Sequence, residues 1–265
     1  MAKGREAEIL KHDPLLEQYV KVSGKVKENS RNLTNILIGV AVVGALALIG
    51  WLIYSRRANN AAETMAEGFR VNDAVVQNPI PAGVQGYAYT TQDEKHRKAY
   101  EAFSKAANEY PSYNGDLGRY YAATHQLAFE PEKAEATLKE LAAKDSPIGW
   151  QAQMALGGRY ESAGKFDDAV ATYQKLVAKP GDLSPYLLKL KLARSLEGAG
   201  KTKEAADIYF ELAGTDDVRE TGIGTEATSR LTILDPDRVE KLPAPKPKPG
   251  LGGIGGIGGA PISVR

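Results

Sequence analysis

Residues 156–180 read LGGRYESAGKFDDAVATYQKLVAKP, and the spacing of small and large side chains in this stretch recurs along the chain. The same spacing returns 36 residues later, in residues 192–212, and 35 residues earlier, in residues 121–141. Its second half appears once more, in residues 99–111. Self-similarity at a nearly fixed period predicts a stack of equivalent units, each of which buries its apolar side against its neighbours.

Pairs of antiparallel helices explain this pattern. A small residue on the first helix, such as Gly157, faces a small residue on the second, such as Ala169, because only small side chains let two helix axes approach closely. Larger residues such as Tyr173 fill the space beside this contact. Gly164 and Gly200 fit the turns between the helices, since glycine takes φ > 0 without steric cost. The residues expected to pack in this way are Ala99, Phe103, Ala122, Ala134, Gly157, Tyr160, Ala169, Tyr173, Ala193, Ala205 and Tyr209.

These residues resemble the L-G-x-x-Y … A-x-x-x-F … P pattern of the tetratricopeptide repeat, whose period is about 34 residues. The resemblance implies an all-α fold in which about four helical hairpins form a tetratricopeptide-like α-solenoid, with residues 224–234 as a capping helix. The helices are expected at residues 59–78, 93–110, 115–128, 132–144, 148–163, 166–179, 184–199, 202–214 and 224–234.

A second feature lies upstream of the repeats: residues 36–53, ILIGVAVVGALALIGWLI, contain no charged side chain. At about 1.5 Å per residue a helix of this length reaches about 27 Å, close to the roughly 30 Å hydrocarbon thickness of a bilayer. Trp51 and Tyr54 near its end are typical of a membrane interface. A buried core helix is the alternative, but such a helix normally shows a polar stripe. We therefore expect a single transmembrane helix over residues 33–55.

The position of this run argues against a cleaved signal peptide, whose apolar region is shorter and follows a short basic segment. An uncleaved anchor divides the chain into a cytoplasmic N-terminal tail (1–32), the span, a repeat domain (56–235) and a disordered Pro/Gly-rich tail (236–265). Basic residues are slightly more frequent before the span than after it, which favours a cytoplasmic N-terminus and an exported repeat domain. The helix at residues 59–78 would continue from the span, with Gly68 in a close-packing position.

Composition narrows the chemistry. The chain has 34 basic and 33 acidic residues, so it carries no strong net charge that would favour nucleic acid. It has no cysteine, which excludes disulfides and thiolate zinc sites. His12, His96 and His125 fit structural positions, and the common hydrolase and phosphate-loop motifs do not occur. We therefore expect no enzyme activity, no metal and no cofactor.

A solenoid of this type offers a concave groove lined by the first helix of each hairpin. By repeat position, the side chains expected to contact a ligand there are Arg119, Gln126, Gln151, Met154, Glu161, Leu190, Arg194 and Glu197. Tetratricopeptide domains that grip chaperone C-termini use a clamp of lysine and asparagine at set positions, and here Ala123 stands where asparagine is needed. Arg119 and Arg194 are the candidates for contacting an acidic or backbone-rich ligand, with a solvated charge as the alternative role.

The layout of residues 33–234 resembles bacterial single-pass membrane proteins with an exported tetratricopeptide domain, of the ancillary SecYEG translocon subunit type. The resemblance implies a non-enzymatic adaptor in the inner membrane that recruits protein partners on the periplasmic side. Translocon subunits, periplasmic chaperones and client segments are the partners that it implies. The alternatives are an envelope-assembly or cell-division coordinator and a self-associating structural homo-oligomer.

Overall fold

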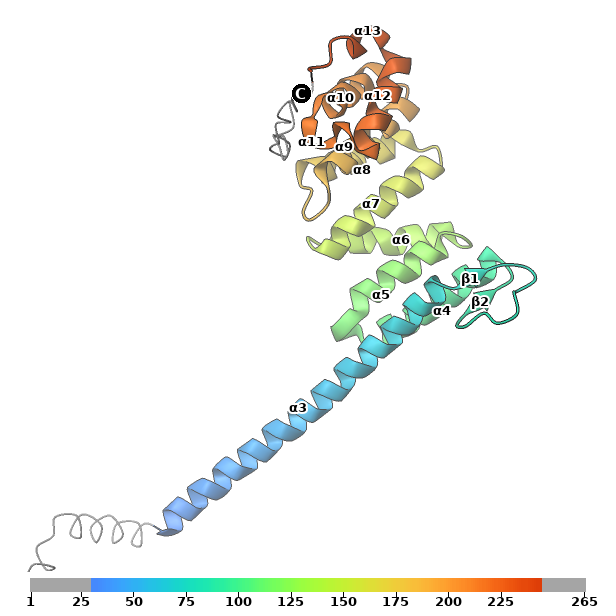
Figure 1. The fold of residues 1–265 in the computed structure, drawn as a ribbon. Helices are drawn as coiled ribbons and strands as arrows, with labels where there is room; N and C mark the ends of the chain where they lie inside the picture. Colours follow the sequence, from blue (N-terminus) through green and yellow to red (C-terminus); the bar gives the residue numbers. More distant parts are fainter. Residues whose placement is uncertain (1–29, 245–265) are drawn as a thin grey trace, which may run out of the picture. The chain divides into compact units, whose positions relative to one another are not determined.

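The computed structural model describes residues 30–244, which form a series of α-helices with one pair of very short strands (Figure 1). The chain divides into two compact units, residues 1–62 and residues 63–265. The expected N-terminal tail up to residue 29, with His12, and the Pro/Gly-rich tail from residue 245 lie outside the described residues.

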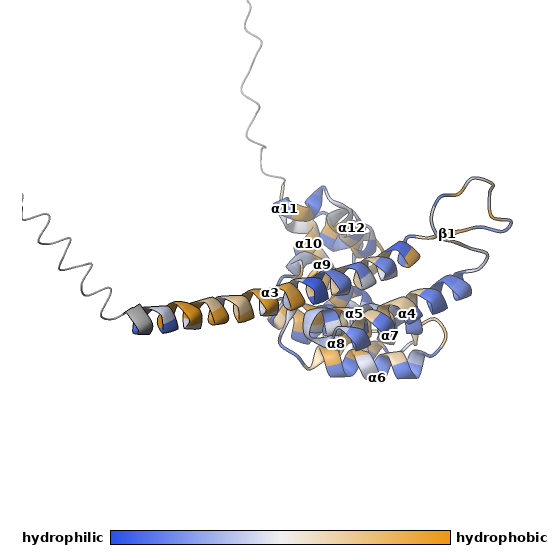
Figure 2. Ribbon diagram, turned by 90° about the horizontal axis from the view of Figure 1, so that it is seen from below, coloured by the Kyte–Doolittle hydropathy of each residue, from blue (hydrophilic) through white to orange (hydrophobic). Residues whose placement is uncertain are grey.

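Helix α3 (Ser30–Asn72) contains the whole apolar run and continues beyond the expected end of the span at residue 55. Large apolar side chains are exposed along the run, with Ile36 at 64% and Trp51 at 62%. In Figure 2 much of the ribbon of α3 along this run is orange, the colour of hydrophobic residues. A helix that is apolar on all sides needs apolar surroundings to cover it. By length and composition, this helix near the N-terminus fits a membrane anchor or a signal sequence.

The repeat helices follow the expected order and stack in sequence order from α4 to α12 (Figure 1). Their bounds are α4 (Gln92–Glu109), α5 (Pro111–Gln126), α6 (Pro131–Ala142), α7 (Pro147–Ser162), α8 (Phe166–Ala178), α9 (Pro185–Gly198), α10 (Thr202–Gly214) and α12 (Gly222–Leu234). These bounds lie within two residues of the sequence prediction, except that α5 starts at Pro111, and a kink at Asn114, with φ of −134°, follows. The predicted helical fold of packed antiparallel pairs is confirmed.

Small residues bring the paired helices together. A Cβ atom added to Gly157 in α7 would lie 2.5 Å from the ring of Tyr173 in α8, which is fully buried. In the first hairpin, a Cβ atom on Gly68 of α3 would lie 2.5 Å from the ring of Phe103 in α4. All the residues expected to pack in this way are buried except Tyr160, which is partly exposed. Bulkier residues at these glycine positions would force the helices apart.

The turns inside the third and fourth hairpins adopt the left-handed backbone that favours glycine. Gly164 has φ of 71° and Gly200 has φ of 76°. The backbone N–H of the lysine after each glycine reaches back 2.9 Å, to the carbonyl of Tyr160 in one turn and of Leu196 in the other. These bonds satisfy carbonyls at the helix ends, which is the usual role of a glycine at this position.

The segment after α3 differs from the prediction. The helix ends at Asn72 rather than at residue 78, and two-residue strands β1 (Val75–Val76) and β2 (Ala88–Tyr89) pair in parallel beyond it. Consecutive β-branched residues and the following Asn78-Pro79 both disfavour helix, which accounts for the earlier end.

The C-terminal boundary of the repeat domain also differs. A short helix α11 (Asp216–Arg219) precedes α12, and another, α13 (Pro236–Val239), follows it. Pro236 ends α12 but also occupies the first turn of α13, where its missing N–H costs nothing. Leu242 then packs against the core cluster of the last hairpins. The folded region therefore extends beyond the expected boundary at residue 235.

We predict that Gly157→Ala lowers the free energy of unfolding by about 1–3 kcal/mol, because the added methyl group overlaps the Tyr173 ring. Gly158→Ala is the matched control, since its Cβ atom would lie 3.9 Å from the Tyr173 hydroxyl. The control should be neutral or more stable by up to about 1 kcal/mol, because alanine favours helix. Urea unfolding of the full-length protein in detergent, followed by circular dichroism, measures both. Equal stabilities of the two variants would contradict the close contact.

Candidate protein-interaction surfaces

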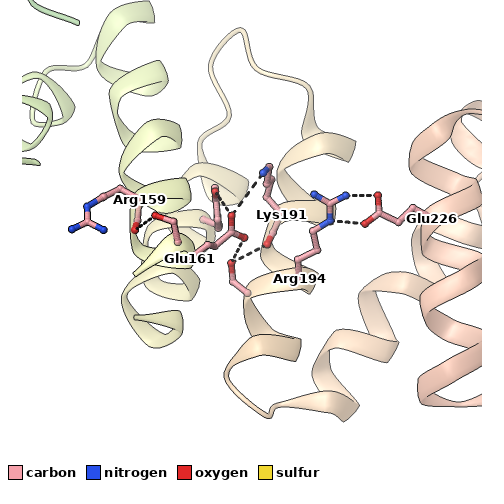
Figure 3. A network of polar contacts seen from close by, with 8 residues as sticks. Arg159, Glu161, Lys191, Arg194 and Glu226 are labelled. Carbon is pink, nitrogen blue, oxygen red and sulfur yellow. Dashed lines mark hydrogen bonds and ion pairs between the residues drawn. The ribbon is translucent and has the colours of Figure 1, made fainter. Parts of the chain in front are cut away.

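A polar network joins the first helices of successive hairpins (Figure 3). Glu161 near the end of α7 accepts a 2.8 Å hydrogen bond from Ser195 Oγ on α9, and its carboxylate lies 3.7 Å from Lys191 Nζ. Arg194 extends the network to α12 through a bidentate pair with Glu226, in which Nε lies 2.5 Å from one carboxylate oxygen. Bidentate charge-assisted pairs are among the strongest hydrogen bonds in proteins. Glu161 and Arg194, which were both expected to face a ligand, are therefore paired with other side chains of the repeat domain.

The same arrangement occurs twice in the repeat register. Glu197 follows Glu161 by 36 residues and accepts a 3.0 Å hydrogen bond from Arg230 Nε on α12. Each carboxylate also accepts from a tyrosine of its own hairpin, from Tyr173 at 3.3 Å and from Tyr209 at 3.1 Å. Burial raises the pKa of both tyrosine hydroxyls, that of Tyr209 to about 12, so both remain donors at neutral pH. Each carboxylate links helix pairing within a hairpin to the stacking of the next.

Two of the expected ligand contacts line one cleft between α9 and α12. Arg194, Glu197 and Gly198 from α9, with Glu226 and Arg230 from α12, surround a volume of about 420 Å³. Hydrogen bonds to Glu226 raise the pKa of the Arg194 guanidinium. The cations and carboxylates of this cleft are already paired, so a charged ligand would have to displace an internal partner.

Arg119 and Gln126 line a second cleft, of about 230 Å³, formed by α4, α5 and α6. Arg119 is paired with Glu140 on α6. Gln126 is only 6% exposed, and its side-chain amide donates a 2.8 Å hydrogen bond to Glu130. Both side chains thus line the cleft, but each already has a hydrogen-bonding partner within its own hairpin.

The remaining expected contacts differ in accessibility. Leu190 is 4% exposed and belongs to the core, because α9 is covered on several sides and buries six of its residues. Its side chain is therefore not accessible to a ligand. Met154 is partly buried against the same core cluster, whereas Gln151 on α7 is partly exposed.

None of the expected ligand contacts lines a third cleft, which lies on α7 between α6 and α8. It consists of two adjoining cavities of about 270 and 320 Å³, with lysines from α6 and α8 on their walls. The signal that marks it in the sequence is Lys175, which stands where the neighbouring hairpins carry Glu140 and Glu211. A comparison of charges across the repeat register, rather than of apolar residues alone, points to this position.

Two histidines meet at the junction of α4 and α5. The Nδ1 atoms of His96 and His125 lie 3.0 Å apart, and the His125 ring stacks on Phe103. Burial, followed by the neighbouring His96 and Lys95, lowers the pKa of His125 to about 4. His125 is therefore neutral at pH 7 and fills an apolar packing position. Within residues 30–244, no group of three or more potential ligands could hold a metal ion.

We predict that the free energy of unfolding falls by about 1–2 kcal/mol between pH 7 and pH 5 because of His125. Below its unfolded pKa near 6.5 the unfolded state binds a proton that the folded state rejects down to about pH 4, so acid favours unfolding. His125→Leu, which places at this position the residue found at Leu196, should flatten the dependence. Urea titrations at several pH values measure it, and an unchanged slope in the variant would contradict the assignment.

A sequence model of the tetratricopeptide repeat matches residues 130–185 and, in a second overlapping match, residues 159–216. These ranges contain α6 to α10, with the close contact of Gly157 on Tyr173 and the left-handed turn residues Gly164 and Gly200. No curated protein and no solved structure gives a significant match. Residues 130–216 thus carry tetratricopeptide repeats, in a chain that also has a long apolar helix near its N-terminus.

Proposed function

We propose that the protein is a membrane-tethered adaptor, without enzyme activity, that recruits protein partners through its repeat domain. The observation that carries this proposal is the order of the parts: an uncharged run with exposed apolar side chains, then tetratricopeptide hairpins. Repeats of this kind generally form binding surfaces for other proteins. Confinement to one membrane raises the effective concentration of that surface toward membrane-bound partners.

The proposed orientation places the N-terminus in the cytoplasm and the repeat domain on the exported face of a bacterial inner membrane. The distribution of basic residues supports it. Those close to the apolar run are Lys21, Lys25, Lys27 and Arg31 before it and Arg56, Arg57 and Arg70 after it, and the N-terminal segment also carries Lys3, Arg5 and Lys11.

The proposed partners are subunits of the protein translocon, periplasmic chaperones or emerging client segments. The support is the resemblance of the layout, a span followed by an exported tetratricopeptide domain, to ancillary translocon subunits. The internal pairing of Arg194 and Arg119 bears on the binding mode, because surfaces whose charges are already paired favour partners that contribute backbone and apolar contacts.

We predict that alkaline phosphatase fused after Ala244 is active and that green fluorescent protein fused at the same position is dark. Alkaline phosphatase is active only when it is exported. Green fluorescent protein matures in the cytoplasm, but it stays dark when it is exported in an unfolded state through the general secretion route. This fusion point keeps α13 and Leu242 packed against the core. Fluorescence without phosphatase activity would contradict the proposed orientation.

Crosslinking in intact membranes, followed by mass spectrometry, tests the partner class. We expect translocon subunits or periplasmic chaperones to be recovered with the full-length protein. With Gly158→Ala as the matched control, the close-contact variant Gly157→Ala perturbs the repeat domain but leaves the apolar run unchanged. Its crosslinks should decrease relative to those of Gly158→Ala. Division proteins, outer-membrane assembly proteins or self-links as the sole products would overturn the proposed partners.

A further inference from the structure

The cleft on α7 between α6 and α8 carries an excess of positive charge. Its charged lining residues are four lysines, Lys139, Lys144, Lys175 and Lys179, and a single carboxylate, Asp145. The two cavities that form it share Ala142, Ala143, Gln153 and Lys175, so they form one continuous surface. Such a surface attracts an acidic ligand and repels a basic one.

The neighbouring hairpins show what is unusual about this one. In the second hairpin Arg119 on the first helix pairs with Glu140 on the second, and in the fourth Lys189 pairs with Glu211. The third hairpin carries Lys175 in the register of these two glutamates. The position therefore has a cation where its neighbours have a carboxylate.

Lys175 also differs from the other lysines of the cleft in its surroundings. Lys139 pairs with Glu135 at 2.8 Å, Lys144 with Asp116 at 2.6 Å and Lys179 with Asp145 at 2.6 Å. Lys175 is exposed and forms no ion pair with any residue that the structure describes. Gln153 of α7 lines the same two cavities, and its side-chain amide donates a 2.8 Å hydrogen bond to the Ala142 carbonyl.

Apolar and aromatic side chains complete the cleft. Trp150 lies against Gly181 and donates its indole N–H to Asp145 at 3.2 Å, which holds the ring in place at one end. Leu156 and Tyr160 line the other end, where the Lys139 ammonium lies 5.9 Å from the Tyr160 ring centre. Fixed aromatic rings beside cations provide both apolar contact area and charge for a peptide side chain.

We propose that this lysine-lined cleft binds an acidic protein segment that carries an aromatic or large apolar side chain. A carboxylate of the segment pairs with Lys175 and so supplies the charge that Glu140 and Glu211 supply in the neighbouring hairpins. The protein's own residues 245–265 are not suitable, since they contain two lysines and an arginine but no acidic side chain. This inference rests on the proposed adaptor function and adds the site and the chemistry of the partner.

Binding of a short fluorescein-labelled peptide, in which glutamates flank two phenylalanines, tests the proposal by fluorescence anisotropy. The full-length protein in zwitterionic detergent is titrated against it. Lys175→Glu should weaken binding about tenfold or more, and Lys175→Gln should weaken it less. Both variants should fold normally, because glutamate occupies this register in both neighbours. Lys203→Glu is the matched control: an exposed lysine of α10, it lines none of these clefts and should change the affinity less than about twofold.

Three outcomes would overturn the proposal: equal binding by Lys175→Glu and the unaltered protein, equal weakening by Lys203→Glu, or equal binding of a peptide with lysine in place of each glutamate. If binding fails in these ways while membrane crosslinking still recovers protein partners, the adaptor function stands and the assigned cleft is wrong. If crosslinking recovers no partner but the peptide still binds with the expected dependence on Lys175, the cleft stands and the proposed partners are wrong.

Discussion

The stack depends on the close approach of two helices within each hairpin. In the third hairpin Gly157 lies against Tyr173, and in the first Gly68 lies against Phe103. The same Tyr173 donates its hydroxyl to Glu161, which also accepts a hydrogen bond from Ser195 on the next hairpin. Helix pairing and hairpin stacking thus share one contact. Each unit buries its apolar side only against its neighbours. A substitution that disrupts this shared contact therefore destabilises more than one hairpin.

Local signals explain why most of the fold could be predicted from the sequence. The repeat period, the turn at Gly164 and the prolines that open several helices all act within one hairpin, so the helix bounds follow closely. The position of Leu190 and the lysine-lined cleft could not be predicted in this way. Both depend on which face of α7 or α9 is covered by other hairpins, and a helical period contains no such information. The parallel strands and α13 likewise depend on contacts made outside a single repeat.

The charges of the repeat domain fall into two classes. Arg194, Glu161 and Glu197 form pairs between hairpins and serve the architecture. Lys175 replaces a carboxylate at a position where surface pairs contribute little to stability, so the exchange costs the fold little. What it changes is the set of ligands that the surface attracts. A surface of this kind beside a membrane can select an acidic protein segment without any catalytic group.

Hydrogen exchange of the protein in native membranes, compared with the purified protein in detergent, tests most directly whether the repeat domain holds a partner at this surface. The account predicts slower exchange in α6, α7 and α8 in membranes, where partners are present, with little change in α10 and α12. Lys175→Glu should remove that protection. Identical exchange in the two preparations, or protection that is uniform along the repeat domain and independent of Lys175, would contradict it.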